Sequence, residues 1–201
     1  MSILALEFSS AVGSVAFRGA DGSTIVRQFP ADRQHSGLFY ENLSEVRHGC
    51  GLAEIIVVGL GPGSYAGTRI AIATAMGLRA ASNARLVGLP SICAFDFPEY
   101  CVAGDARRSS YFFAHVEQGR CLEGPSLLTE EELRAKMREH PHLPFVAAER
   151  LPRFSEITLG HPSAALLAEL AEQADGREEN LEPIYLRQPY ITTAKAMPWT
   201  R

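Results

Sequence analysis

Apolar and polar positions in the first half of the chain follow a pattern that predicts three strands, then helices and strands in turn. The period changes in residues 36–47, where Phe39, Leu43 and Val46 share one helical face. The run at 55–60 is apolar throughout, which indicates a strand buried on both faces. We expect strands at residues 3–8, 12–18, 23–29, 55–60 and 85–89, and helices at residues 36–47 and 68–83.

The second half repeats the order β-β-β-α-β-α. Thr129 precedes its first helix and Glu132 lies three residues on, a spacing that predicts a capping box. The stretch ILALEFSSAVGSVAF lies over CVAGDARRSSYFFAH, with Glu7 opposite Asp105. We expect strands at residues 100–105, 110–117, 120–128 and 144–148, and helices at residues 129–139 and 163–173.

This repeated order predicts an α/β protein of two lobes. A three-stranded meander followed by alternating helices and strands favours a mixed sheet with helices on both faces. Such a pair of lobes is the plan of the actin-like (ASKHA, ribonuclease H-like) fold, here with a reduced second lobe. We assign residues 1–98 to an N-terminal βββαβαβ lobe, and residues 99–201 to a smaller C-terminal βββαβα lobe with an extended tail.

A cleft between the lobes would be faced by the residues that end the first strand of each. These are Glu7, followed by Ser9 in a tight turn, and Asp105, followed by Arg107 and Arg108. The two arginines could meet a phosphate or carboxylate group, or could be solvated residues of a turn.

Composition narrows the class of protein. Hydrophobic residues make up 46% of the 201 residues and charged residues 21%, with a net charge of −4, so no overall basic character indicates nucleic-acid binding. No basic n-region precedes the short apolar start, and no apolar run has membrane-spanning length. The four cysteines form no CxxC pair, which favours reduced thiols. We expect a cytoplasmic protein with no membrane contact.

The stretch EIIVVGLGPGSYAGTRI at 54–70 joins a predicted strand to a predicted helix through a glycine-rich turn. It contains G-x-G-x-x-A, but it follows the fourth strand, and the next strand ends without the acidic residue that binds a ribose. The sequence has no Gly-Lys-Ser/Thr, which excludes a Walker A loop. Neither phosphate-binding motif therefore explains the glycines.

A backbone role explains them instead. Gly61, Gly63 and Gly67 permit a positive φ or the close approach of another segment, and Pro62 fixes φ before Gly63, as in a type II turn. Ser64 can cap the helix. The free N–H groups of the helix start could bind an anion, or the turn could have no ligand at all.

The helix that follows, at 68–83, is apolar nearly all round. Ile70, Ala73 and Gly77 share one face, while Ile72 and Met76 share another. Such a helix is buried on more than one side. Its small residues would let a second helix approach closely, from a second protein or from the second lobe.

These residues resemble the bacterial TsaB (YeaZ) family. GPGSYAGTRI is similar to the family's GxGPGS(F/Y)TGxRIG signature, and ILALEFSS to its ILAIDTS strand. Three weaker matches follow in the family's order, namely His35-Ser36, AGDARRSSYFF at 103–113 and PIYLR at 183–187. The resemblance therefore spans nearly the whole chain.

The resemblance implies an actin-like fold and a non-catalytic role in making N6-threonylcarbamoyladenosine on tRNA. A family member pairs with the catalytic subunit TsaD, joins the ATPase TsaE in a larger complex, touches tRNA only indirectly and forms a homodimer when alone. It needs no cofactor and has no metal site. By resemblance the docking surface is the helix pair at 36–47 and 68–83, with these candidate residues: Phe39, Leu43, Tyr65, Arg69, Ile72, Ala73, Met76, Gly77 and Ala80.

The sequence departs from the family and from TsaD at informative positions. Glu7 replaces the family's Asp, Ala66 its Thr, and Ala71 its Gly. The longer side chain of Glu7 would disturb a tightly positioned metal–nucleotide site. None of the six histidines forms the H-x-x-x-H pair of TsaD.

Two enzyme classes remain as alternatives. An actin-like ATPase or kinase would bind nucleotide by itself. A glycoprotease-like metallopeptidase is less favoured, because neither HExxH nor GxSxG is present and Ser64 has no evident base partner in sequence.

Overall fold

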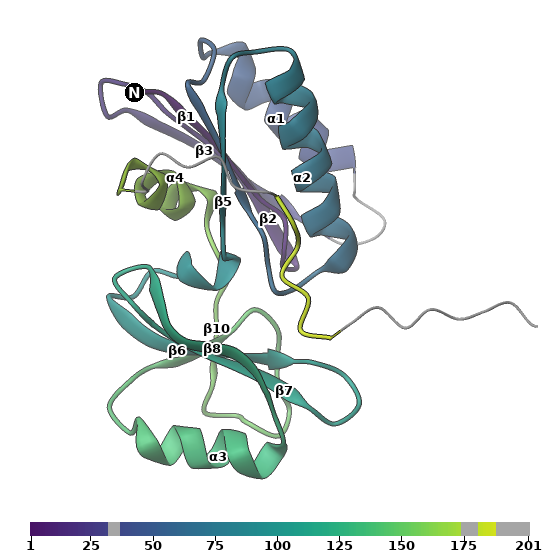
Figure 1. The fold of residues 1–201 in the computed structure, drawn as a ribbon, viewed down its shortest axis with the longest axis vertical. Coiled ribbons are helices and arrows are strands. Elements are labelled where there is room, and N and C mark those ends of the chain that lie inside the picture. The colour runs from purple at the N-terminus through teal and green to yellow at the C-terminus, as the bar shows by residue number, and fades with distance from the viewer. Residues whose placement is uncertain (32–36, 174–180, 188–201) are drawn as a thin grey trace, which may run out of the picture.

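Two five-stranded mixed sheets form the framework of the computed structural model, which describes residues 1–31, 37–173 and 181–187 (Figure 1). The first sheet has the order β3-β2-β1-β4-β5, with β1 at Ile3–Glu7, β2 at Val12–Arg18, β3 at Thr24–Pro30, β4 at Ile55–Gly59 and β5 at Arg85–Leu89. The second has the order β8-β7-β6-β9-β10, with β6 at Glu99–Asp105, β7 at Tyr111–Glu117, β8 at Arg120–Leu128, β9 at Phe145–Ala147 and β10 at Thr158–Leu159.

The two sheets have the same topology, which confirms the predicted repeat. In each, the first three strands form an antiparallel meander, and the next two add in parallel on the other side of the first strand. Glu7 and Asp105 end the equivalent strands β1 and β6. The two-residue strand β10 was not predicted, because two residues are too few for a periodic pattern.

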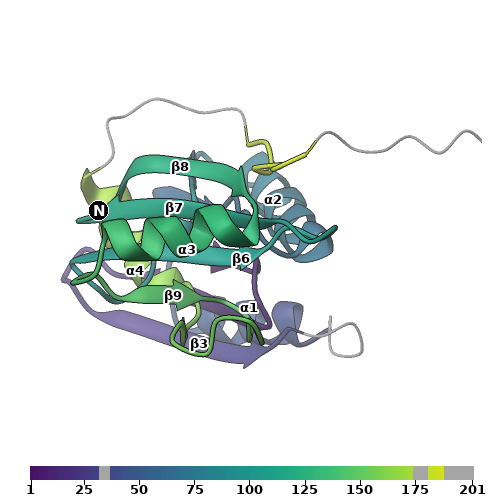
Figure 2. The same cartoon turned by 90° about the horizontal axis from the view of Figure 1, so that it is seen from below.

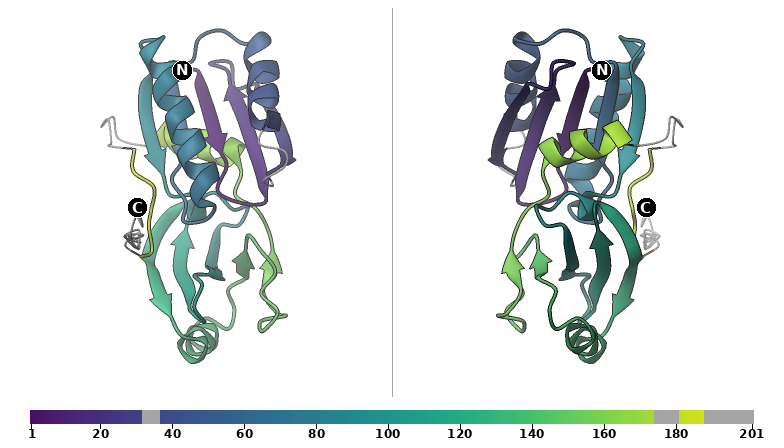
Figure 3. Two further views of the ribbon diagram at one scale, coloured as in Figure 1. Left: turned by 90° about the vertical axis from the view of Figure 1, so that its right-hand side faces the viewer. Right: turned by 90° about the vertical axis from the view of Figure 1, so that its left-hand side faces the viewer.

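Helices cover both faces of the first sheet. On one face lie α1 at Gly37–His48 and α2 at Tyr65–Ala80, and on the other lies α4 at Ala164–Gln173 (Figures 1 and 3). The continuous apolar runs of β1 and β4 follow from this cover, since every residue of both strands is buried. The edge strand β3 keeps one face in solvent and is mostly exposed.

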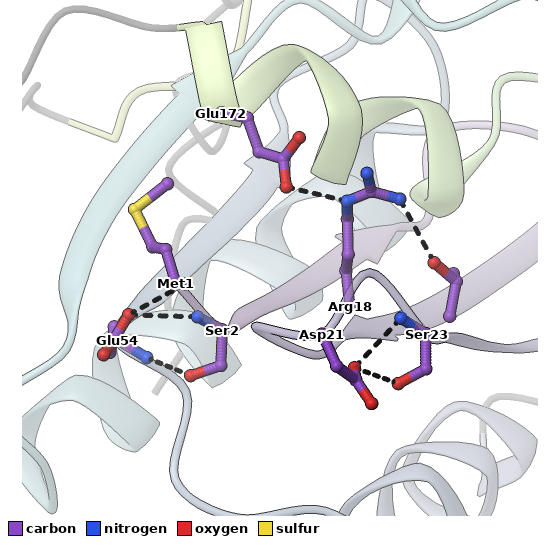
Figure 4. A network of polar contacts seen from close by, with 8 residues as sticks. Met1, Ser2, Arg18, Asp21, Ser23, Glu54 and Glu172 are labelled. Atoms are coloured by element: carbon purple, nitrogen blue, oxygen red, sulfur yellow. Dashed lines mark hydrogen bonds and ion pairs between the residues drawn. The ribbon is translucent and has the colours of Figure 1, made fainter.

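The position of α4 corrects the division of the chain into lobes. The helix predicted at 163–173 was assigned to the C-terminal lobe, but it packs on the N-terminal sheet. Leu167 and Ala168 are fully buried against Ile3, Ala5 and Val57. Arg18 on β2 also donates from Nε to Glu172 of α4 at 2.7 Å (Figure 4). The apolar face of α4 thus covers the sheet face that α1 and α2 leave open.

The second sheet holds α3, at Glu130–Glu139, on its outer face, as Figure 2 shows. Leu133 of α3 is fully buried against Cys101 and Phe113. The predicted capping box is confirmed: the Thr129 hydroxyl accepts from the Glu132 amide, and the Glu132 carboxylate accepts from the Thr129 amide. The inner face packs on η1, at Ser91–Cys93, which follows β5.

The observed helix boundaries differ from the predicted ones by up to three residues. The helix predicted at 68–83 begins at Tyr65, because Ser64 already caps it, and ends at Ala80, where the Ala81 amide bonds the carbonyl groups of Leu78 and Arg79. Within the described residues, no helix is both long and apolar enough to cross a membrane.

The placement of α4 can be tested with Leu167→Ala. The truncation leaves a cavity between α4 and the first sheet, so we expect the free energy of unfolding to fall by about 2–5 kcal/mol. Below full unfolding, hydrogen exchange should rise in β1 and β4 and stay unchanged in β6 and β9. Faster exchange confined to the second sheet would contradict the assignment.

Candidate functional site

The glycine-rich turn between β4 and α2 is fixed against the end of β1 by backbone contacts. The Ser64 amide donates to the Ser9 carbonyl oxygen at 2.6 Å. A Cβ atom on Gly63 would collide with that same oxygen, and one on Gly67 would collide with the Phe8 carbonyl oxygen. Both glycines are therefore required for close approach, as predicted.

The prediction of a type II turn with Gly63 after Pro62 was wrong. The left-handed conformation lies at Gly61, with φ of 85°, and not at Gly63. The Gly61 amide donates to the Ser91 hydroxyl at 2.9 Å, which ties the turn to η1. The turn is therefore held from two sides, by the end of β1 and by the start of the connection to the second lobe.

Ser64 is the N-cap of α2, as predicted. Its hydroxyl accepts from the Gly67 amide at 3.2 Å, and the Thr68 amide bonds the Ser64 carbonyl oxygen. The amides of Gly61, Ser64, Gly67 and Thr68 thus all have partners within the chain. These bonds account for the turn by its own structure, and anion binding at Ser64 stays a prediction.

Glu7 does not face an open cleft, which corrects the expectation. Its side chain is fully buried at the end of β1. Oε1 accepts from the Ser9 amide at 2.7 Å, while Oε2 lies against Gly59, beside the Ser91 hydroxyl, without a hydrogen-bond partner. Burial raises the pKa of this carboxyl, although the hydrogen bonding from Ser9 acts in the opposite direction. Ser9 is also buried.

The other predicted cleft residues lie in the turn between β6 and β7. Asp105 accepts from the Arg107 amide at 2.7 Å, and its Oδ2 lies 3.3 Å from Nη1 of Arg107. Arg107, Arg108 and Ser109 all have positive φ values, a conformation that costs non-glycine residues on the order of 1 kcal/mol each. The Arg107 side chain is 83% exposed, so its ion pair stabilises the turn only weakly.

The predicted docking residues divide into two groups. Phe39, Leu43 and Ile72 are buried in the core between the two helices and the first sheet, which corrects their assignment to an outer surface. They occupy the apolar face that each helix turns toward the sheet. The remaining six form one exposed stripe along α2, which we call the α2 stripe: Tyr65, Arg69, Ala73, Met76, Gly77 and Ala80.

The α2 stripe is open to solvent in this chain. The side chains of Tyr65 and Met76 are 54% and 56% exposed, and a Cβ on Gly77 would meet nothing within 4 Å. Burial of α2 under the second lobe, the alternative considered for its apolar residues, therefore does not occur along this stripe.

The sequence analysis assigned no role to two residues that lie next to these features. Ser91 lies beside Glu7 and holds Gly61, but a serine after Pro90 carries no periodic signal. Tyr185 packs on Tyr65 with ring centroids 5.6 Å apart. Only its place in the PIYLR stretch singled it out.

The expectation that this chain has no metal site can be compared only with the described residues. Among the described residues, no three His, Cys, Asp or Glu side chains are placed to hold a metal ion. His35 and Ser36, which carry part of the resemblance, lie outside the described residues.

Two glycines of α2 provide a matched test of the turn. Gly67→Ala should lower the free energy of unfolding by about 1–3 kcal/mol, because its Cβ meets the Phe8 carbonyl oxygen. Gly77→Ala should raise it by about 0.5–1 kcal/mol, because the new Cβ is in open space and alanine favours a helix. Chemical denaturation measures both. If both variants changed the free energy of unfolding by the same amount in the same direction, the close approach of Gly67 to Phe8 would be contradicted.

Glu7 predicts a pH-dependent stability. Its pKa in the folded protein lies above the ordinary 4.5, so its contribution is fully present below that value and is lost as pH rises through the folded pKa. The free energy of unfolding of Glu7→Gln, relative to the wild type, should therefore increase as pH rises from 4 to 8. Other carboxylates titrate alike in both proteins and cancel. A difference that does not vary with pH would refute the buried acid.

Solved structures from Pseudomonas aeruginosa share this arrangement. One is described as an uncharacterized protein with similarity to peptidase YeaZ, with a TM-score of 0.75 and 23% identity over 92% of this chain and 99% of that one. Another is YeaZ itself, with a TM-score of 0.71 and 22% identity over the same shares. The sequence matches no family model and no curated protein. The chain thus has the fold of YeaZ, an α/β fold of two lobes.

Proposed function

We propose that this chain is a non-catalytic subunit of the machinery that makes N6-threonylcarbamoyladenosine on tRNA, and that it pairs with TsaD. The YeaZ fold over 92% of the chain supports this, as does the turn GPGSYAGTRI at 61–70. TsaE would join the larger assembly, and tRNA would be contacted only indirectly. The proposal places the protein in the cytoplasm.

The α2 stripe is the observation that carries the proposal. Its centre is made of small residues, with Ala73, Gly77 and Ala80 spaced three or four apart, so the backbone of a second helix can approach closely. Tyr65 and Met76 add large apolar side chains at its edges, which are already half exposed.

The contribution of α1 to the proposed docking surface differs from the one that the sequence predicted. Phe39 and Leu43 support the docking surface from below, because they pack in the core under α1 and α2. The outward side of α1 presents Tyr40, Glu41 and Ser44, beside α2 on the same face of the sheet (Figure 3). A partner on the α2 stripe would meet these polar residues at the rim of its interface.

The buried Glu7 favours a partner role over catalysis by this chain. A carboxylate that binds a metal–nucleotide complex must be ionised and accessible to that complex. The side chain of Glu7 is enclosed, and burial raises its pKa. The catalytic centre would then belong to TsaD. Without TsaD, the same stripe would pair two copies of this chain in a symmetric homodimer.

The rival function is an actin-like ATPase or kinase. It predicts that the isolated chain binds Mg-ATP with micromolar affinity, which calorimetry would detect. Such binding would contradict the proposal that this chain needs no cofactor. Zinc or iron bound to the purified protein would instead favour a metallopeptidase.

Gly77→Arg tests the docking surface. The long cation has open space in the free chain, so folding should be unaffected or improved, but it would occupy the place of a helix packed on the stripe. We expect the wild type to co-elute with TsaD from the same organism, and Gly77→Arg to lose the complex and the homodimer.

The control is Gly49→Arg, which adds the same group at an exposed glycine that also has open space, outside α2. It should behave as the wild type. A Gly77→Arg variant that folds normally and still co-elutes with TsaD would disprove the α2 stripe. Failure of the wild type to bind TsaD would disprove the partner role.

A further inference from the structure

Residues 181–187, here called the strap, run in extended form past the start of α2 and reach the second lobe (Figure 1). On the first lobe, the Ile184 amide donates to the Leu60 carbonyl oxygen at 2.8 Å. Leu181 and Ile184 pack on the edge of the core beneath α2. The strap is thereby attached to the segment that leads into the glycine-rich turn.

The strap also contacts the first residue of the α2 stripe, Tyr65, on one side. The Tyr185 ring packs against the Tyr65 ring with the centroids 5.6 Å apart, and the Arg69 guanidinium lies over the Tyr65 ring, 5.1 Å from its centroid. Nη1 of Arg69 also donates to the Tyr65 hydroxyl at 2.7 Å. Three side chains thus form one cluster, of which two belong to the stripe and one to the strap.

The far end of the strap contacts the second lobe. Leu186 packs on the core between η1 and the second sheet. Nη2 of Arg187 donates to the Arg107 carbonyl oxygen at 3.4 Å, in the left-handed turn between β6 and β7. The strap therefore joins both lobes, in addition to the chain connections through η1 and through residues 160–163.

These contacts are few and lie near the surface. Tyr185 is 45% exposed, and Leu181, Ile184 and Leu186 are only partly buried. Segments of this kind open locally at a small cost in free energy, well below that of global unfolding. The strap can therefore leave its place while both lobes stay folded.

We propose that the strap is an intramolecular competitor for the α2 stripe, and that partner binding displaces it from Tyr65. The inference rests on the proposed function for the identity of that partner. A helix packed along the stripe from Tyr65 to Ala80 would need the space over the Tyr65 ring that Tyr185 occupies. Displacement would also release the strap from Leu60 in the first lobe and from Arg107 in the second, and so couple docking to the freedom of the two lobes to move.

The first experiment uses the isolated full chain and Tyr185→Ala. Loss of the ring contact should speed hydrogen exchange of the Ile184 amide, and trypsin cleavage after Arg187, by about three- to tenfold. Tyr185→Phe keeps the ring that packs, tilted, against Tyr65 and should stay close to the wild type. Leu122→Ala removes an exposed apolar side chain from β8 that makes none of the strap contacts described above, and should change neither rate.

The second experiment measures affinity for TsaD. Removing a competitor raises the fraction of the chain that is ready to bind, so Tyr185→Ala should bind about three- to tenfold more tightly than the wild type. In the complex, exchange at Ile184 should be faster than in the free chain. Weaker binding by Tyr185→Ala, or slower exchange at Ile184 in the complex, would instead make the strap part of the interface and overturn the proposal.

The two proposals fail in different ways. If neither the wild type nor Tyr185→Ala binds TsaD, the partner role is wrong and the competition falls with it, although the rates in the isolated chain still report whether the strap is held by Tyr65. If both bind with equal affinity, the partner role stands and the competition is refuted. Unchanged exchange in isolated Tyr185→Ala refutes the strap directly.

Discussion

The contact between the start of α2 and the end of β1 organises the N-terminal lobe. Carbonyl groups of Phe8 and Ser9 lie so close to the turn that Gly63 and Gly67 cannot carry a side chain, and the Ser64 amide bonds one of these oxygens. The axis of α2 is set by this contact, because Ser64 is also the N-cap of the helix. The direction of the α2 stripe follows from it.

Glu7 is enclosed next to this contact, at the end of β1. Gly59 and Ser91 close the space beyond the end of β1, while the Ser9 amide holds Oε1. An acid in this place is costly to ionise, since burial outweighs the hydrogen bonds that favour its charged form. The position is part of the lobe's interior.

The two lobes are joined more closely than their sequence order suggests. The last described helix, α4, returns to the first sheet and buries Leu167 and Ala168 there, so the N-terminal lobe is completed by residues from the end of the chain. The strap then runs from Leu60 in the first lobe to the turn around Arg107 in the second. Events at the α2 stripe can therefore reach the second lobe through a short chain of contacts, from Tyr65 to Tyr185 and Arg187.

Sequence alone determined the order of the helices and strands along most of the chain, the repeat of three strands and a helix, the Thr129 capping box and the glycine-rich turn, because each depends on local periodicity or on residues close together in the chain. The tertiary structure decided what depends on distant segments. Phe39 and Ile72 face the sheet and not the solvent. Gly59 and Ser91 enclose the side chain of Glu7, and α4 packs on the sheet of the N-terminal lobe. A helical pattern shows that a face is apolar, but only the packed chain shows whether its own sheet, a second segment or solvent lies against that face.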